Sequence, residues 1–209
     1  MTHCDLEFPV QGQTIPRDHG YALYGALSRA IPELHGADWI GIHGIGARLL
    51  GSDTLTLRPK GSLRIRVPID RIGGVLPLAG RTVEIAGRSV VIGVPSVWPL
   101  QPAAVLDARL AVIKLTGGVK REGQGFVPAD YEARFQAEAS RQLERLGVEG
   151  ELHIRGRSSI TVGGRRVIGC AVQVVGLSAE HSVRLQVHGI GGKRTMGCGV
   201  FRPARSTRA

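Results

Sequence analysis

The chain has 209 residues, with 27 lysines and arginines against 17 aspartates and glutamates, so its formal net charge at pH 7 is +10. A surface this basic is typical of proteins that bind a polyanion, most commonly nucleic acid, although a merely soluble basic surface is the alternative. No stretch reaches the roughly 18 apolar residues of a membrane span, and the first residues lack the apolar run of a secretory signal.

The cysteines and aromatic residues exclude two further kinds of site. Cys4, Cys170 and Cys198 form neither a CxxC pair nor a Cys/His ligand pattern, so we expect no zinc site. We expect no cofactor of another kind either. Because signal and span are both lacking, we expect the protein in the reducing cytoplasm. Only 4% of the residues are aromatic, which argues against a surface built mainly of base-stacking rings. Phosphate contacts and shape are therefore the expected means of recognition.

The first half of the chain predicts the element order β-α-β-β-α-β. A strand over 3–11 precedes a helix from about Gly20 to Ile31, with Asp18 as its N-cap and Pro32 as its end. The following elements are a strand over 39–45, a hairpin of 54–59 and 62–68 around Lys60-Gly61, a short helix over 69–80, and a hairpin over 81–93 that turns at Ala86-Gly87.

The first predicted helix has two faces. Tyr21, Tyr24 and Ser28 follow one another at i, i+3 and i+7, and their polar tips favour an exposed face. The apolar residues that repeat at helical spacing, and so predict the face on the core, are Leu23, Leu27, Ala30 and Ile31.

The second half repeats the order of the first after a proline-rich connector at 99–104, so the expected domains span residues 1–100 and 101–209. Two such units in one chain predict an α+β fold of tandem ferredoxin-like domains, similar to RNA-recognition motifs. The elements of the second unit are a strand over 105–115, a helix from Pro128 to Gly147, a hairpin around Gly163-Gly164, a helix over 179–188 capped by Ser178, and a strand within 199–203.

The stretch HGIGGKRTMGCGVFRP at 188–203 combines glycines with cations, which favours phosphate binding, a flexible turn being the alternative. A nucleotide-binding P-loop would need glycine in place of Val187, and a dinucleotide fingerprint would need glycine in place of Arg194. Both cofactor sites are therefore excluded. The candidate phosphate-binding residues of this loop are Gly189, Gly191, Gly192, Lys193, Arg194 and Gly197.

Three stretches carry a resemblance to a known family: IPRDHGYALYGALSRAIPELH, RVPIDRIGGVLPLAGRTVEIAG and SAEHSVRLQVHGIGGKRTMGCGVFRP. The sequence resembles the CRISPR-associated endoribonucleases that cut precursor guide RNA within each repeat, in the RAMP superfamily of repeat-associated RNA-binding proteins, and within them the myxobacterial subtype. The resemblance covers nearly the whole chain. The C-terminal glycine loop is common to the superfamily, whereas the N-terminal stretch is the more specific one.

The resemblance implies metal-independent cleavage in which a ribose 2′-hydroxyl attacks the neighbouring phosphate, leaving a 2′,3′-cyclic phosphate and a 5′-hydroxyl. Such chemistry needs a base for the 2′ proton, an acid for the leaving oxygen, and charge to stabilise the phosphorane. Histidine suits the proton transfers because its unperturbed pKa is about 6.5.

His35, directly after the first helix, stands where the family commonly places its catalytic histidine. A histidine that caps the helix C-terminus is the alternative. His43 is the second candidate, or else a satisfied strand residue. Ser28 stands where some relatives have a tyrosine, a departure for which Tyr21 or Tyr24 could substitute; the relatives' lysine has no clear counterpart, Arg48 being the nearest downstream cation.

The expected RNA-binding surface also includes arginines on strands and hairpins, each of which could instead be a solvated surface charge. The candidate arginines outside the glycine loop are Arg64, Arg66, Arg157, Arg165 and Arg166.

The main alternative function is a non-catalytic RNA-binding subunit of a CRISPR effector complex, in which other effector subunits would be partners. A DNA-binding protein is disfavoured because no helix-turn-helix or zinc module is present.

Overall fold

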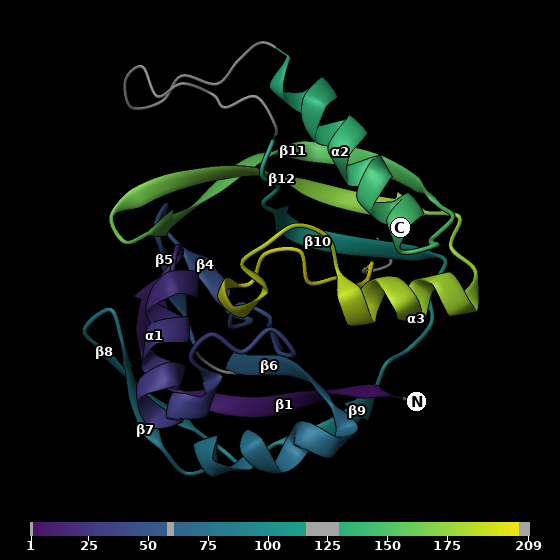
Figure 1. Ribbon diagram of the computed structural model, residues 1–209. Helices are drawn as coiled ribbons and strands as arrows, with labels where there is room; N and C mark the ends of the chain where they lie inside the picture. The colour runs from purple at the N-terminus through teal and green to yellow at the C-terminus, as the bar shows by residue number, and fades with distance from the viewer. Residues whose placement is uncertain (1, 58–60, 116–129, 205–209) are drawn as a thin grey trace. The chain divides into compact units, whose positions relative to one another are not determined.

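The computed structural model describes residues 2–57, 61–115 and 130–204, and the chain forms two compact units (Figure 1). The first unit holds residues 1–100 together with two later segments, 160–167 and 194–197. The second unit holds the rest of the chain from Gln101. The tip of the second-half hairpin and part of the glycine loop therefore pack with the first unit.

The first unit is built on an antiparallel sheet in the order β3-β6-β1-β8-β7, and β9 also pairs with β1. Its first, second, third and fourth ferredoxin-like strands are β1, β3, β6 and β8, with helix α1 between the first two. Two 3-10 helices, η2 and η3, stand where one short helix was expected. The bounds are β1 His3–Gln11, α1 Gly20–Ala30, β3 Gly41–Ile42, β6 Gly61–Pro68, η2 Ile69–Gly74, η3 Leu76–Leu78, β7 Thr82–Ile85, β8 Arg88–Ile92 and β9 Ser96–Pro99.

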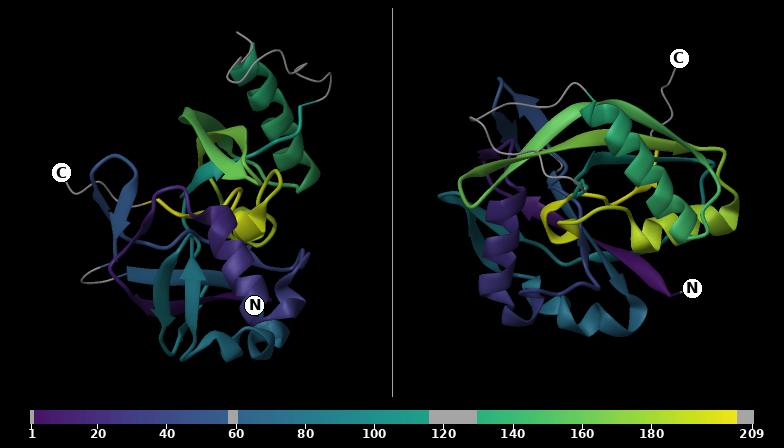
Figure 2. Two further views of the ribbon diagram at one scale, coloured as in Figure 1. Left: turned by 90° about the vertical axis from the view of Figure 1, so that its left-hand side faces the viewer. Right: turned by 45° about the horizontal axis from the view of Figure 1, so that its top comes forward.

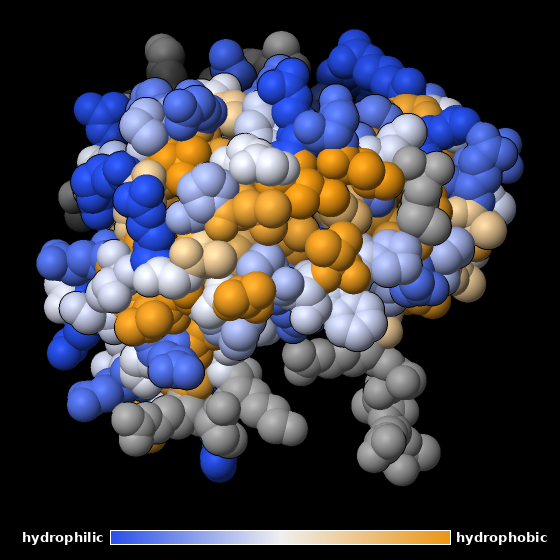
Figure 3. Space-filling view, turned by 90° about the horizontal axis from the view of Figure 1, so that it is seen from below, coloured by the Kyte–Doolittle hydropathy of each residue, from blue (hydrophilic) through white to orange (hydrophobic). Residues whose placement is uncertain are grey.

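Alternation along β1 and β6 places one face of this sheet in the core. Phe8 pairs with Leu63, and Leu6 pairs with Ile65, all four fully buried. Helix α1 packs its predicted apolar face into the same cluster, since Leu23 and Leu27 are buried there. Other apolar side chains reach the surface (Figure 3), and those exposed on η2, η3 and β9 are Ile69, Leu76, Val97 and Trp98.

One predicted hairpin is wrong. Residues 54–56 do not pair with 62–68; instead β5 Thr54–Thr56 lies between β2 Thr14–Pro16 and β4 Arg48–Leu50 in a separate small sheet. The alternating apolar residues of β6 gain more by pairing with the buried strand β1 than with the polar β5. Lys60 lies outside the described residues. The strand expected over 39–45 is only two residues long, Gly41–Ile42.

The second unit has the same ferredoxin-like strand order, β11-β12-β10-β13. Phe135 of α2 and Leu185 of α3 are buried in one apolar cluster with Leu106 and Val172 of the sheet. Figure 2 shows the long β11–β12 hairpin. The bounds are β10 Val105–Ala111, α2 Tyr131–Arg145, β11 Glu151–Val162, β12 Arg165–Val175, α3 Ala179–His188 and β13 Arg202–Pro203.

Several local predictions in the second half are confirmed. Gly163 and Gly164 have φ of 56° and 75°, as a tight hairpin turn needs. Ser178 caps α3, since its Oγ accepts from the N–H of His181 at 3.1 Å. Gly147 takes φ of 61° after the end of α2. Pro128, the expected start of that helix, lies outside the described residues.

In the first half, the turn at Ala86-Gly87 is confirmed, with φ of 49° and 73°. The predicted cap of α1 is wrong. His19 occupies the N-cap position, and no side chain caps the helix there. The carboxylate of Asp18 instead accepts the backbone N–H of Thr161 at 2.7 Å, because the hairpin tip 160–167 lies within its reach. Among the described helices, none has the length and apolar character of a membrane span.

Candidate active site and RNA-binding residues

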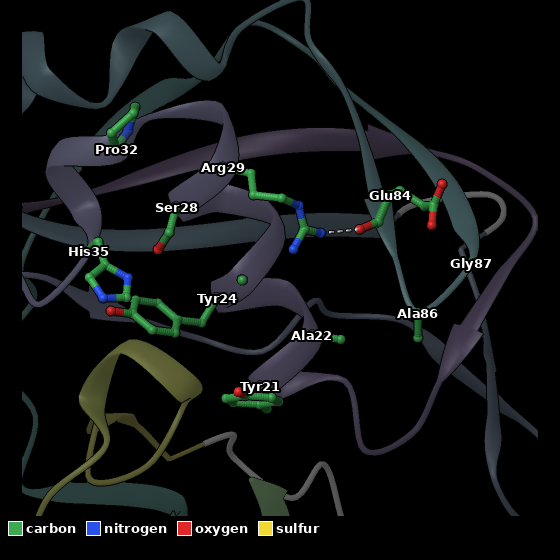
Figure 4. Close-up of a pocket in the computed structure, with 11 residues that line it drawn as sticks. Tyr21, Ala22, Tyr24, Ser28, Arg29, Pro32, His35, Glu84, Ala86 and Gly87 are labelled. Carbon is green, nitrogen blue, oxygen red and sulfur yellow. Dashed lines mark hydrogen bonds between the residues drawn. The ribbon is translucent and has the colours of Figure 1, made fainter. Parts of the chain in front are cut away.

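An open pocket of about 720 Å³ lies along the exposed face of α1. Figure 4 shows residues of α1 on one side and the β7–β8 turn on the other. Tyr24, Ser28 and His35, three of the four candidate catalytic residues, line this pocket together. The complete lining is Tyr21, Ala22, Tyr24, Gly25, Ser28, Arg29, Pro32, His35, Glu84, Ala86 and Gly87.

His35 follows the 3-10 helix η1, Pro32–Leu34, which begins directly after α1. Leu34 is buried and anchors this turn, while His35 is exposed. The imidazole lies nearly parallel to the ring of Tyr24, with 6.2 Å between centroids and 18° between planes. The Tyr24 hydroxyl accepts the backbone N–H of Gly36 at 2.8 Å. Tyr24 therefore constrains His35 in two ways. Its ring stacks on the imidazole, and its hydroxyl binds the peptide that follows His35.

Ser28 lies one turn after Tyr24 on the same helix. Its Oγ is buried and has no hydrogen-bond partner among the described residues. A buried hydroxyl without a partner is uncommon, because it loses the free energy of hydration without gaining a new hydrogen bond. Because Ser28 lines the pocket, this hydroxyl is a candidate donor to a ligand there.

Arg29 is a pocket residue that the sequence analysis missed. Its Nη2 donates to the backbone oxygen of Glu84 at 3.3 Å, so the side chain reaches across the pocket from α1 to β7. Gly25 leaves space for it, since a Cβ there would lie 3.4 Å from Arg29 Nη1. The available signal was spacing: Arg29 is four residues after Gly25 and directly follows Ser28.

His43 is not among the residues that line this pocket. Its backbone N–H donates to the oxygen of Arg64 at 2.9 Å, next to β3, and its side chain is half-buried. A proton on this imidazole would add to the lowering of the pKa of Asp5, after the larger effect of Arg66. The structure therefore places the two candidate histidines in different surroundings and associates only His35 with Tyr24 and Ser28.

Arg66, a candidate RNA-binding arginine, is not accessible to RNA in this structure. It is buried, and its Nε and Nη2 donate to the two carboxylate oxygens of Asp5 at 2.7 and 2.9 Å. Burial raises the pKa of Asp5, but the hydrogen bonds and charge of Arg66 outweigh it, so this pKa lies below its ordinary value. Arg64 is half-buried and paired with Glu7 at 2.8 Å.

The 3-10 helix η4, Arg194–Met196, packs against β3 and α1. Burial lowers the pKa of Arg194, the nearby charge of Arg66 lowers it further, and Asp38 opposes this shift. Gly20 permits the close approach, because a Cβ there would overlap the carbonyl oxygen of Met196. Arg194 is therefore half-buried rather than fully presented to a ligand.

The candidate glycines of the loop make close contacts within the protein. Their N–H groups already donate to protein oxygens in this structure. At Gly191 a Cβ would also overlap the oxygen of Val112, so glycine is needed there for packing. The bonds run from Gly189 to Leu185 O, Gly191 to Gln142 Oε1, Gly192 to Val112 O, and Gly197 to Arg194 O.

The remaining candidate cations are more accessible. Arg165 and Arg166 are exposed at the start of β12, beside the glycine turn. Arg157 is exposed on β11 and pairs with Glu132 at 2.6 Å. Lys193 is half-buried with φ of 64°, a conformation that glycine would adopt with less strain. Arg48, on β4, is exposed and does not line the pocket.

Comparison with known proteins identifies similar sequences over nearly the whole chain. Residues 4–206 match a family model described as Cas6 CRISPR. The chain is 41% identical over 203 residues to the CRISPR-associated endonuclease Cas6 of Myxococcus xanthus, which covers 97% of this chain and 82% of that protein.

Solved structures support the fold assignment. A CRISPR-associated protein Cas6 superposes with a TM-score of 0.72 at 14% identity, covering 97% of this chain and 100% of the other. A RAMP protein described as binding different RNA substrates gives a TM-score of 0.66 at 14% identity, covering 98% and 100%. The match over nearly the whole sequence, together with the tandem ferredoxin-like units, shows that the chain belongs to the Cas6 family of CRISPR-associated proteins.

Proposed function

We propose that the protein is an endoribonuclease that cuts CRISPR precursor RNA within its repeats and does so without a metal ion. The Myxococcus relative is named an endonuclease, and the structurally similar RAMP protein is described as binding RNA. The observation that carries the proposal is the convergence of His35, Tyr24, Ser28 and Arg29 on one open pocket.

In this proposal, the His35 imidazole takes the proton from the attacking ribose 2′-hydroxyl. The 2′ oxygen bonds to phosphorus as the bond to the 5′ oxygen breaks, which leaves a 2′,3′-cyclic phosphate and a 5′-hydroxyl. The leaving oxygen takes its proton from water, since the pocket is open. General base catalysis of this kind is worth about 10²–10⁴-fold in rate.

Ser28 and Arg29 would stabilise the phosphorane. The Ser28 hydroxyl can donate to a non-bridging oxygen, and the Arg29 guanidinium supplies the positive charge for which the sequence offered no clear residue. Tyr24 would act as a positioning residue, through its ring on His35 and its bond to Gly36. Binding and alignment of the RNA backbone would supply the rest of the acceleration.

The proposed RNA grip rests on exposed cations rather than on glycine amides. Arg165 and Arg166 are the best placed, with Lys193 and Arg157 in support, whereas Arg66 is excluded by burial. The place of action would be the reducing cytoplasm, which fits three buried cysteines that form no disulfide, Cys4, Cys170 and Cys198. Partnership with other effector subunits is compatible with this function.

The test mixes the purified protein with end-labelled repeat RNA in EDTA. We expect one cut per repeat, a product ending in a 2′,3′-cyclic phosphate, and no cut when the nucleotide at the cleavage site carries a 2′-deoxyribose. His35→Ala should reduce the rate by about 10²-fold or more while RNA affinity is retained, and His43→Ala serves as the matched control. Tight RNA binding without any cut would instead support the non-catalytic subunit.

A further inference from the structure

Tyr21 is an exposed aromatic residue at one end of the pocket that the proposed chemistry does not use. Its side chain remains 45% exposed although it lines the pocket. It lies three residues before Tyr24, about one helical turn from the residue that stacks on His35. Figure 4 shows its ring at the start of α1, separate from the Tyr24–His35 pair.

Small residues line the pocket beside Tyr21. Ala22 and Gly25 line the pocket there, and a Cβ on Gly25 would meet only the tip of Arg29 within 4 Å. A glycine inside a helix costs roughly 0.5–1 kcal/mol relative to alanine, so the open space at Gly25 comes at a cost in helix stability. The opposite wall is the turn of Ala86 and Gly87, which also presents little side chain.

In-line attack imposes a conformation on the RNA that this end of the pocket fits. In a stacked A-form strand the 2′-hydroxyl does not lie opposite the leaving 5′ oxygen, so a nucleotide at the scissile phosphate must rotate out of the stack. A base released in this way is commonly held on an aromatic ring. Arg29 also offers hydrogen-bond donors at the edge of the same space.

We propose that Tyr21, beside Ala22 and Gly25 in the pocket lining, stacks on the unpaired base of a nucleotide adjacent to the scissile phosphate. This inference rests on the proposed RNA cleavage, for which it names a nucleobase subsite. Tyr21 would be a specificity and positioning residue: its ring holds the rotated nucleotide while His35 acts on the ribose.

The test combines changes in the protein and in the RNA. A series of repeat RNAs is prepared in which a single abasic nucleotide stands at a different position near the cleavage site in each RNA. The cleavage rate of each RNA is measured under single-turnover conditions. Stacking on one aromatic ring is worth about 5- to 100-fold, so Tyr21→Leu should slow cleavage of intact RNA by that factor. Tyr21→Leu should not slow cleavage further for the RNA that lacks the base proposed to stack on Tyr21. Tyr21→Phe keeps the ring and should cut at nearly the wild-type rate.

Two further measurements keep this inference separate from the cleavage proposal. A 2′-deoxy, uncleavable RNA with 2-aminopurine at that position should show a fluorescence change with wild-type protein and Tyr21→Phe, but not with Tyr21→Leu. Trp98→Leu, an exposed aromatic residue on β9 outside the pocket, is the matched control. Equal slowing of intact and abasic RNAs by Tyr21→Leu, or an unchanged fluorescence response, would overturn the subsite even if cleavage itself is normal. A normal fluorescence response without cleavage would overturn only the proposal that the protein is a nuclease.

Discussion

At the scale of single residues, the hydroxyl of Tyr24 anchors the peptide that follows His35. Tyr24→Phe keeps the ring on the imidazole but removes the acceptor for the N–H of Gly36. Such a bond contributes about 0.5–1.5 kcal/mol, so we expect the cleavage rate to fall roughly 2- to 10-fold with RNA affinity unchanged. Single-turnover kinetics and RNA titration check this. A rate equal to that of the wild type would mean that the bond does not position His35.

Asp5 and Arg66 form a buried pair that is set by a single register of β1 against β6, in which they lie opposite each other. Removing one partner of such a pair costs about 3–5 kcal/mol. We therefore expect Asp5→Ala to lower the unfolding free energy by about that amount in urea denaturation. The double variant Asp5→Leu/Arg66→Met removes both charges and should recover much of the loss. An Asp5→Ala protein as stable as the wild type would contradict this account.

The same pair predicts a dependence of stability on pH. The pKa of Asp5 is lowered in the folded state, so its contribution is fully present above the unfolded value of about 3.9 and is lost as pH falls through the folded pKa. Denaturation midpoints measured between pH 6 and pH 3 should fall less steeply for Asp5→Asn than for the wild type. Parallel curves would show that other carboxylates determine acid unfolding.

At the scale of elements, helix α1 is held by the segments that pack against it. Gly20 lies against Met196, where a Cβ would overlap the carbonyl oxygen, whereas Gly25 faces open space apart from the tip of Arg29. Alanine is the better helix former at both positions. We expect Gly20→Ala to destabilise the protein and Gly25→Ala to stabilise it, each by about 1 kcal/mol. Thermal denaturation of the pair checks this, and two changes of the same sign would refute it.

At the scale of the whole molecule, the net charge of +10 predicts an RNA affinity that falls with salt. If Arg165 and Arg166 each contact a phosphate, replacing both by alanine should reduce the slope of log K against log salt by about 1.4–1.8. Arg141→Ala/Arg145→Ala on α2 removes the same charge from another element and should leave the slope nearly unchanged. Equal salt slopes in the wild type and both double variants would mean that Arg165 and Arg166 do not contact the RNA phosphates.

The sequence by itself determined the features that depend on neighbours in the chain. Glycine pairs formed the expected turn at Gly163-Gly164, and Ser178 capped α3 as expected, because turn and cap energies are local. The face of α1 with Tyr24 and Ser28 followed from helical spacing, and the position of His35 followed from the resemblance. The repeated element order predicted two ferredoxin-like units for the same reason: alternation and helical periodicity are properties of short segments.

Only the tertiary structure decided which segments meet. β5 pairs with β2 and β4 instead of its neighbour β6, and Asp18 binds Thr161 instead of capping its own helix. Arg66 alternates with apolar residues as an exposed cation would, yet it is buried and paired with Asp5 of the neighbouring strand β1. Arg29 lines the pocket only because β7 lies across from α1. Such contacts depend on packing between distant segments, which the local pattern of a sequence does not record.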